Sequence, residues 1–142
     1  MKSIPFILRD HREELWRHWA DALADEVDAD YQDLLSSPLG ERILRTTIDD
    51  LIACSEAEEY EVPALMKRLE ERVTAESEHR VALGFTVRDM VAAVHVLRRV
   101  MIDVLIDALV LDEMPSFADS LDQLKAVNAF LDRLVCATMA AA

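Results

Sequence analysis

Turn-forming residues are scarce in this chain: only two glycines, Gly40 and Gly84, and four prolines are spread over 142 residues. A sandwich or barrel of many short strands needs frequent tight turns, which glycine and proline supply. Hydrophobic residues make up 52% of the chain and recur at helical spacing. A chain of this length forms about one domain. The sequence therefore predicts a single all-α domain over residues 1–142.

Apolar periodicity and capping residues divide the chain into about five helices. The first helix is expected from about residue 4 to the acidic stretch before Asp30, with Trp16 and Trp19 anchoring it in the core. The segment "SSPL" at 36–39 starts a second helix, which ends in the acidic "SEAEEYE". A third helix begins near Pro63.

The segment "LGFTVRD" separates the third helix from the fourth. Gly84 suits the left-handed position after a helix, and Thr86 with Asp89 has the spacing of a capping box. We expect the fourth helix over about 87–111, paired with the third in a tight antiparallel hairpin. "MPSFAD" at 114–119, with Ser116 as the capping residue, starts a fifth. The prediction is a compact bundle of about five helices built from antiparallel hairpins.

The last helix, about 116–142, has an apolar seam formed by Leu124, Val127, Leu131 and Leu134. These residues alternate in steps of three and four, a spacing suited to packing against another helix. The helix then runs into "CATMAAA" without a glycine or proline stop. We expect it either to fray or to lead into a C-terminal effector domain.

The charge and the cysteines of the chain indicate which partners and which cellular compartment suit the protein. There are 28 acidic and 15 basic residues, a formal net charge of −13, which opposes binding to nucleic acid or to an anionic membrane. The cysteines Cys54 and Cys136 have no CxxC spacing, and no hydrophobic signal sequence follows the first Met. Charged residues interrupt the most apolar stretch, 90–111, so no membrane span is expected. We expect a cytoplasmic protein.

The histidines give weak signals for a metal or haem. One Glu-x-x-His motif occurs, at Glu76 and His79, whereas a di-iron bundle needs two. His11, Glu14 and His18 could offer a second group, but at most two of them would converge on one point. His95 lies at the edge of a polar strip, a poor place for an axial haem ligand. We expect no metal and no cofactor, and keep a metal or haem sensor on a globin-like bundle as an alternative.

Catalytic motifs are missing from the sequence. Neither cysteine has a histidine arrangement that would activate a thiolate, and the two glycines lie too far apart to form a phosphate-binding loop. We expect that this domain alone is not an enzyme.

Arg98 occupies an unexpected position in the fourth helix. On a helical wheel it falls among Val94, Met101 and Leu105, whereas Arg99 falls on the polar strip. A buried charge needs a partner, so the guanidinium should meet a carboxylate of the first or third helix. A small anionic ligand or a second subunit is the alternative. Arg98, His95, His79 and Arg99 are therefore the candidate ligand or interface residues.

The run "HRVALGFTVRDMVAAVHVLRRVMIDVL" resembles the C-terminal half of the RsbRD N-terminal domain family, helical sensory modules of bacterial RsbT co-antagonist (stressosome) proteins and of some sensor histidine kinases. The matching positions are His79, Gly84, Phe85, Thr86, Leu97 and Arg98. The opening "ILRDHREELWRHW" looks like the first helix of that family. The resemblance covers about residues 4–110 and is strongest over 79–105.

The resemblance implies a sensory input domain of a bacterial signalling protein, a histidine kinase or a stressosome-type regulator. Such a domain would act as a homodimer and pass its signal through the last helix to a downstream effector. The alternative from another class is a free-standing acidic helical protein that binds a basic protein partner.

Overall fold

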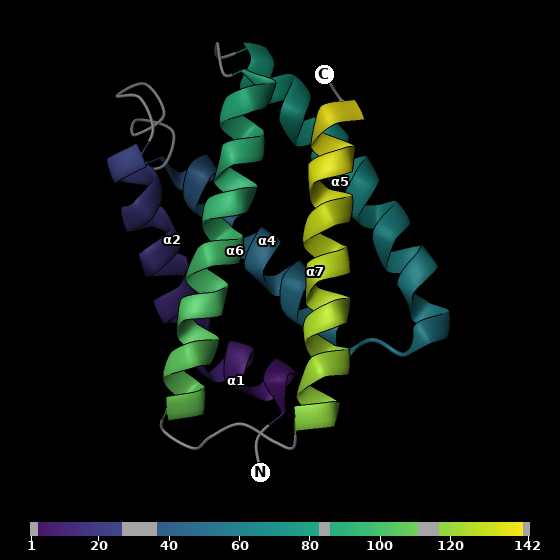
Figure 1. Cartoon of the computed structure of the whole chain (residues 1–142). Helices are drawn as coiled ribbons and strands as arrows, with labels where there is room; N and C mark the ends of the chain where they lie inside the picture. The colour runs from purple at the N-terminus through teal and green to yellow at the C-terminus, as the bar shows by residue number, and fades with distance from the viewer. Residues whose placement is uncertain (1–2, 27–36, 83–85, 111–116, 141–142) are drawn as a thin grey trace.

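The computed structural model describes residues 3–26, 37–82, 86–110 and 117–140, and every element within these ranges is helical (Figure 1). The helices are α1 (Ile4–Asp10), α2 (Arg12–Glu26), α4 (Pro38–Glu56), α5 (Val62–Ala82), α6 (Val87–Val110) and α7 (Phe117–Ala140). A short 3-10 helix, η1 (Glu59–Glu61), joins α4 to α5. The prediction of an all-α bundle is confirmed, with six helices in these ranges where about five were expected.

The additional helix arises because the first predicted helix is divided at His11. That residue lies between α1 and α2 with φ −100° and ψ 19°. The bend keeps its hydrogen bonds: the His11 amide donates to the Ile7 carbonyl at 3.0 Å, and the Leu15 amide donates to the His11 carbonyl at 2.8 Å. Nothing in the local sequence marks this break, since neither glycine nor proline stands there.

Tertiary packing explains the bend. α1 crosses one end of the bundle and contacts α4, α6 and α7, whereas α2 runs along α4 and α6 (Figure 1). The bend lets Ile4, Ile7 and Leu8 close that end, where all three are fully buried. A straight helix would carry these side chains along the axis of α2 and away from the ends of α6 and α7.

Local capping fixes the starts of α4 and α6 as predicted. The Ser37 hydroxyl accepts a hydrogen bond from the Gly40 amide at 3.0 Å, with Pro38 in the first helical position. Thr86 and Asp89 form a reciprocal capping box in which each side chain accepts the other's amide at 3.1 Å. The expected roles of Gly84 and Ser116 fall outside the described residues.

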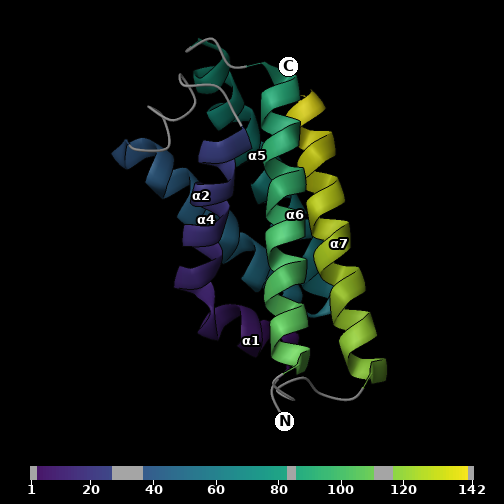
Figure 2. The same ribbon diagram turned by 60° about the vertical axis from the view of Figure 1, so that its left-hand side comes forward.

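α6 and α7 lie side by side and antiparallel, with α4 behind them (Figures 1 and 2). The apolar seam of α7 faces this core: Val127 and Leu131 are fully buried, Leu134 nearly so, and Leu124 packs at the edge. Packing against other helices is what the spacing of this seam predicts. The seam is used within the chain, because α7 packs against α1, α4, α5 and α6.

Tight packing of the third predicted helix along the fourth is not found among the residues that the structure describes. In the described parts of the chain, the main partner of α5 is α7, and its packing extends to α4 rather than along α6. Arg133 of α7 pairs with Glu70 of α5 at 2.6 Å. The core side of α6 is instead covered by α1, α2 and α7.

An ordered set of ion pairs joins the N-terminal helices to α4. The pairs are Arg9 with Glu56, Arg12 with Asp49 at 2.5 Å, and Arg45 with Glu13 at 2.7 Å. The Arg45 guanidinium also lies 4.2 Å from the centre of the Trp16 ring. Pairs this exposed add little stability individually, so their effect is to favour one antiparallel register of α1 and α2 on α4.

None of the described helices combines the length and the apolar character needed to cross a bilayer.

Candidate functional site

Arg98 forms an ion pair that links the two long helices. Its Nη2 donates to Oδ1 of Asp132 on α7 at 2.5 Å. The Arg98 side chain keeps 28% of its surface exposed and that of Asp132 keeps 68%, so the pair lies at the edge of the α6–α7 contact. The Arg98 Nε is buried and has no hydrogen-bond partner among the described residues.

The expected partner of Arg98 is therefore corrected. The guanidinium does meet a carboxylate, but this carboxylate belongs to the last helix and not to the first or third. Arg98 leans from its apolar neighbours toward solvent, since a long side chain can bury its stem while its charged end stays wet. The pairing depends on α6 and α7 being adjacent, which the helical wheel of α6 alone does not reveal.

The other candidates on α6 lie on its solvent side. His95 and Arg99 are both exposed, and they share this side with Arg88 and Ala92. Two large apolar residues continue it, Ile102 at 41% exposure and Ile106 at 51%. We call this stripe the outer face of α6, formed by Arg88, Ala92, His95, Arg99, Ile102 and Ile106, with Asp103 and Asp107 at its side.

Charge is unevenly distributed along the outer face. Arg88 lies at its N-terminal end, His95 and Arg99 lie on either side of its middle, and Asp103 and Asp107 lie toward its C-terminal end. A helix face that is basic at one end and acidic at the other is complementary to itself when two copies run antiparallel. The periodicity of the sequence could have shown this stripe, because its residues recur in steps of four and three.

The group of His11, Glu14 and His18 is only partly brought together. His11 Nδ1 lies 2.7 Å from Oε2 of Glu14, whereas His18 is exposed farther along α2. Glu76 of α5 lies 3.3 Å from Nε of Arg72, so its carboxylate takes part in an ion pair. His79 belongs to the same helix, and its side chain is outside the described set. Among the described residues, no group of three or more His, Cys, Asp or Glu side chains could hold a metal ion.

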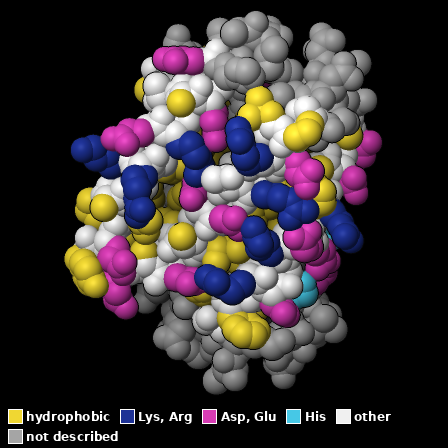
Figure 3. All heavy atoms as spheres, turned by 180° about the vertical axis from the view of Figure 1, so that it is seen from behind, with side chains coloured by type: hydrophobic (Ala, Val, Ile, Leu, Met, Phe, Trp, Pro, Cys, Tyr) yellow, Lys and Arg dark blue, Asp and Glu magenta, His cyan; other side chains and the backbone are white. Residues whose placement is uncertain are grey.

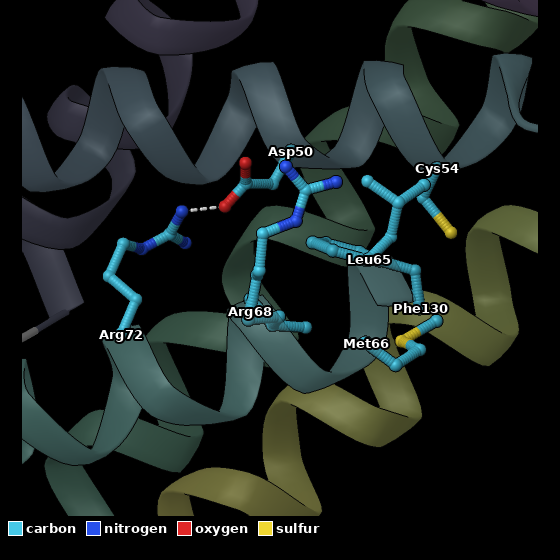
Figure 4. A pocket seen from close by; sticks show the side chains of 8 residues that line it. Asp50, Cys54, Leu65, Met66, Arg68, Arg72 and Phe130 are labelled. Carbon is cyan, nitrogen blue, oxygen red and sulfur yellow. Dashed lines mark ion pairs between the residues drawn. The ribbon is translucent and has the colours of Figure 1, made fainter. Parts of the chain in front are cut away.

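A pocket that the sequence did not suggest opens between α4, α5 and α7 (Figure 4). Its volume is about 230 Å³. Its apolar lining comes from Leu65, Met66 and Leu69 of α5, with Phe130 of α7 and Cys54 of α4. Asp50, Arg68 and Arg72 form its polar side. The only sequence signals are two pairs spaced by four residues, Asp50 with Cys54 and Arg68 with Arg72, and such pairs are common on helices.

The two cysteines differ sharply in environment. Cys54 is buried at 4% exposure, and burial raises the pKa of its thiol. Cys136 is exposed on α7, and neither cysteine forms a disulfide. The Cys54 thiol therefore contributes a neutral surface to the pocket and not a thiolate.

Comparison with known proteins adds no relative to these observations: no protein-family model, no curated protein and no solved structure matches the chain.

Proposed function

We propose that this chain is a sensory input domain of a bacterial signal-transduction protein, a histidine kinase or a stressosome-type regulator, and that it works as a homodimer. The resemblance of residues 79–105 to RsbRD N-terminal domains suggests this class of function. The observation that carries the proposal is the outer face of α6, whose exposed isoleucines and opposed charges suit a second copy of the same chain.

The dimer would pair two α6 helices in antiparallel orientation about a twofold axis. Arg88 would then approach Asp107 of the second copy, and the symmetric contact would repeat this pair. Ile102 would lie over the small side chain of Ala92. Burying Ile102 and Ile106 removes apolar surface from water, which favours association. The charges at the two ends of the face favour the antiparallel direction, because parallel pairing would place Arg88 against Arg88 and Asp107 against Asp107.

The signal would leave through α7. This helix contacts α1, α4, α5 and α6, so a change in any of them alters its surroundings. The Arg98–Asp132 pair ties α7 to the same helix whose other side would form the dimer. A shift of α6 at the dimer contact would therefore move α7, and small helix shifts at subunit interfaces are a known means of transmission.

Sedimentation equilibrium over a range of concentrations tests the dimer directly. We expect a concentration-dependent dimer that Ile106→Glu dissociates, whereas Tyr60→Glu, at an 82% exposed residue of η1, leaves it intact. Arg88→Asp and Asp107→Arg should each weaken the dimer, and the double variant should restore it. A chain that stays monomeric, or a double variant no better than either single one, would reject the proposal.

A second candidate is an acidic protein that sequesters a basic partner, which the net charge of −13 favours. The face seen in Figure 3 argues against it, because Lys and Arg side chains are interspersed there with Asp and Glu. A monomer that binds a basic protein such as a histone, with affinity lost at high salt, would favour this candidate over the first.

A further inference from the structure

The pocket between α4, α5 and α7 combines an apolar interior with a cationic edge. Leu65, Met66, Leu69 and Phe130 present hydrocarbon to it, and the Cys54 thiol is uncharged there. Its volume of about 230 Å³ is smaller than the roughly 300 Å³ from which pockets take drug-sized molecules. A ligand that fits must therefore be small, about the size of one substituted ring or a short branched chain.

The acidic residue of the pocket is already neutralised. Asp50 pairs with Arg72 (Figure 4). The Nε of Arg72 also lies 3.3 Å from Oε1 of Glu76. Asp50 therefore offers little attraction to a cationic ligand, because its charge is opposed by a guanidinium from the neighbouring helix.

Arg68 differs from Arg72 in this respect. It is exposed, it forms no ion pair with any residue that the structure describes, and it extends from α5 across the pocket toward α4 (Figure 4). A planar guanidinium suits two parallel hydrogen bonds to a carboxylate. The apolar interior lies beside it, so an anionic group at Arg68 would leave its hydrocarbon body inside the pocket.

We propose that this pocket binds a small organic carboxylate, with the carboxylate on Arg68 and an apolar body against Leu65, Met66 and Phe130. As a binding site the proposal stands independently, and its part in signalling rests on the proposed sensory function. A bound ligand would touch α5 and α7 together, and α7 is the helix through which the signal would leave. The pocket would thus be the input end of the domain.

Phenylacetate is a suitable probe, and phenylacetamide is its neutral counterpart of nearly the same shape. We expect phenylacetate to give saturable chemical-shift changes in the amide NMR spectrum at Leu65, Met66, Leu69 and Phe130. Phenylacetamide should bind roughly tenfold more weakly, because it loses the charge-assisted hydrogen bonds to Arg68. This comparison uses the unaltered chain and does not depend on any variant folding.

Three variants locate the site. Arg68→Gln should weaken phenylacetate binding by roughly tenfold, whereas Lys67→Gln, the same loss of charge at the next, exposed residue, should leave it unchanged. Leu65→Trp should fill the pocket and abolish binding. Equal binding by the unaltered chain and Arg68→Gln, equal binding of acid and amide, or no saturation in the millimolar range would each overturn the proposal.

The two proposals can fail separately. Sedimentation without ligand decides whether the dimer exists, and the titration decides whether the pocket binds carboxylates. A monomeric chain that binds phenylacetate through Arg68 would reject the sensory dimer and support the pocket. A dimer that binds no carboxylate would support the sensory dimer and reject the pocket.

Discussion

The indole Nε1 of Trp19 donates a hydrogen bond of 2.9 Å to the backbone carbonyl of Ala93, joining α2 to α6 inside the core. That carbonyl lies in the second turn of α6 and accepts from a side chain in a distant part of the sequence. Trp16, one turn earlier on α2, has a buried Nε1 with no hydrogen-bond partner in the part of the chain that the structure describes. The two tryptophans thus differ in how well their polar atoms are satisfied.

This difference predicts unequal effects of the same substitution. Trp19→Phe should lower the free energy of unfolding by about 1–3 kcal/mol, because it removes a buried hydrogen bond and leaves a small cavity. Trp16→Phe should cost less, since its indole N–H has no acceptor to lose. Urea unfolding followed by far-UV circular dichroism measures both. A larger loss for Trp16→Phe would contradict the assigned roles.

The Arg98–Asp132 pair should add little to stability. Asp132→Asn should lower the free energy of unfolding by less than about 1 kcal/mol, because both side chains are partly exposed. Arg98→Leu should be neutral or stabilising, since Val94, Met101 and Leu105 surround the position with apolar surface. Arg133→Leu, at the exposed pair with Glu70, is the control and should bring no gain. If Arg98→Leu lowered the free energy of unfolding by several kcal/mol, the guanidinium would be stabilising the fold, contrary to this prediction.

Shortening a buried side chain of the α7 seam should cost more stability than the same change at an exposed position of that helix. Leu131→Ala should lower the free energy of unfolding by about 2–5 kcal/mol, because the side chain is fully buried. Leu121→Ala, the same change at a 40% exposed position of the same helix, should cost well under half as much. Similar losses at the two positions, measured by urea unfolding, would mean that the seam is not the core contact described.

The Glu13–Arg45 pair makes stability depend on pH in a defined direction. The hydrogen bond from Arg45 lowers the pKa of Glu13 below its ordinary value of 4.5. A carboxyl group with a lowered folded pKa contributes stability above its unfolded pKa and loses it as the pH falls through the folded pKa. The stability difference between the unaltered chain and Glu13→Gln should therefore be present at neutral pH and shrink below pH 4.5.

Glu78→Gln is the matched control for that comparison, because Glu78 is exposed and forms no ion pair with any described residue. Comparing variants at each pH cancels the relief of acidic repulsion that the whole chain gains on acidification. Urea midpoints from neutral pH down to about pH 3 provide the measurement. A Glu13 difference that stays constant across this range would contradict the pair.

The thiols should react at two rates. Cys136 is exposed and should react rapidly with Ellman's reagent at mildly alkaline pH, whereas Cys54 is buried with a raised pKa and should react slowly. Cys136→Ser should remove the fast phase and Cys54→Ser the slow one. Adding urea should merge the phases in the unaltered chain. Rapid reaction of Cys54 in the folded protein would mean that its side of the pocket is open.

Local signals fixed the helix limits in this protein. The Ser37 cap, the Thr86–Asp89 capping box and the proline at the start of α4 lie within one turn of the backbone groups they affect, so the sequence around them suffices. The expected roles of Gly84 and Ser116, which lie outside the described residues, stay predictions. The scarcity of glycine and proline likewise determined the all-α class, because it concerns the whole chain and not any one contact.

Only the tertiary structure decided which helices are neighbours, and the site depends on that choice. The bend at His11, the packing of α5 on α7, the Arg98–Asp132 pair and the pocket beside Arg68 all join residues distant in sequence. A helical wheel gives the side of one helix that seeks burial but not the helix that will cover it. That choice comes from the summed packing free energy of the whole bundle, to which every helix contributes at once.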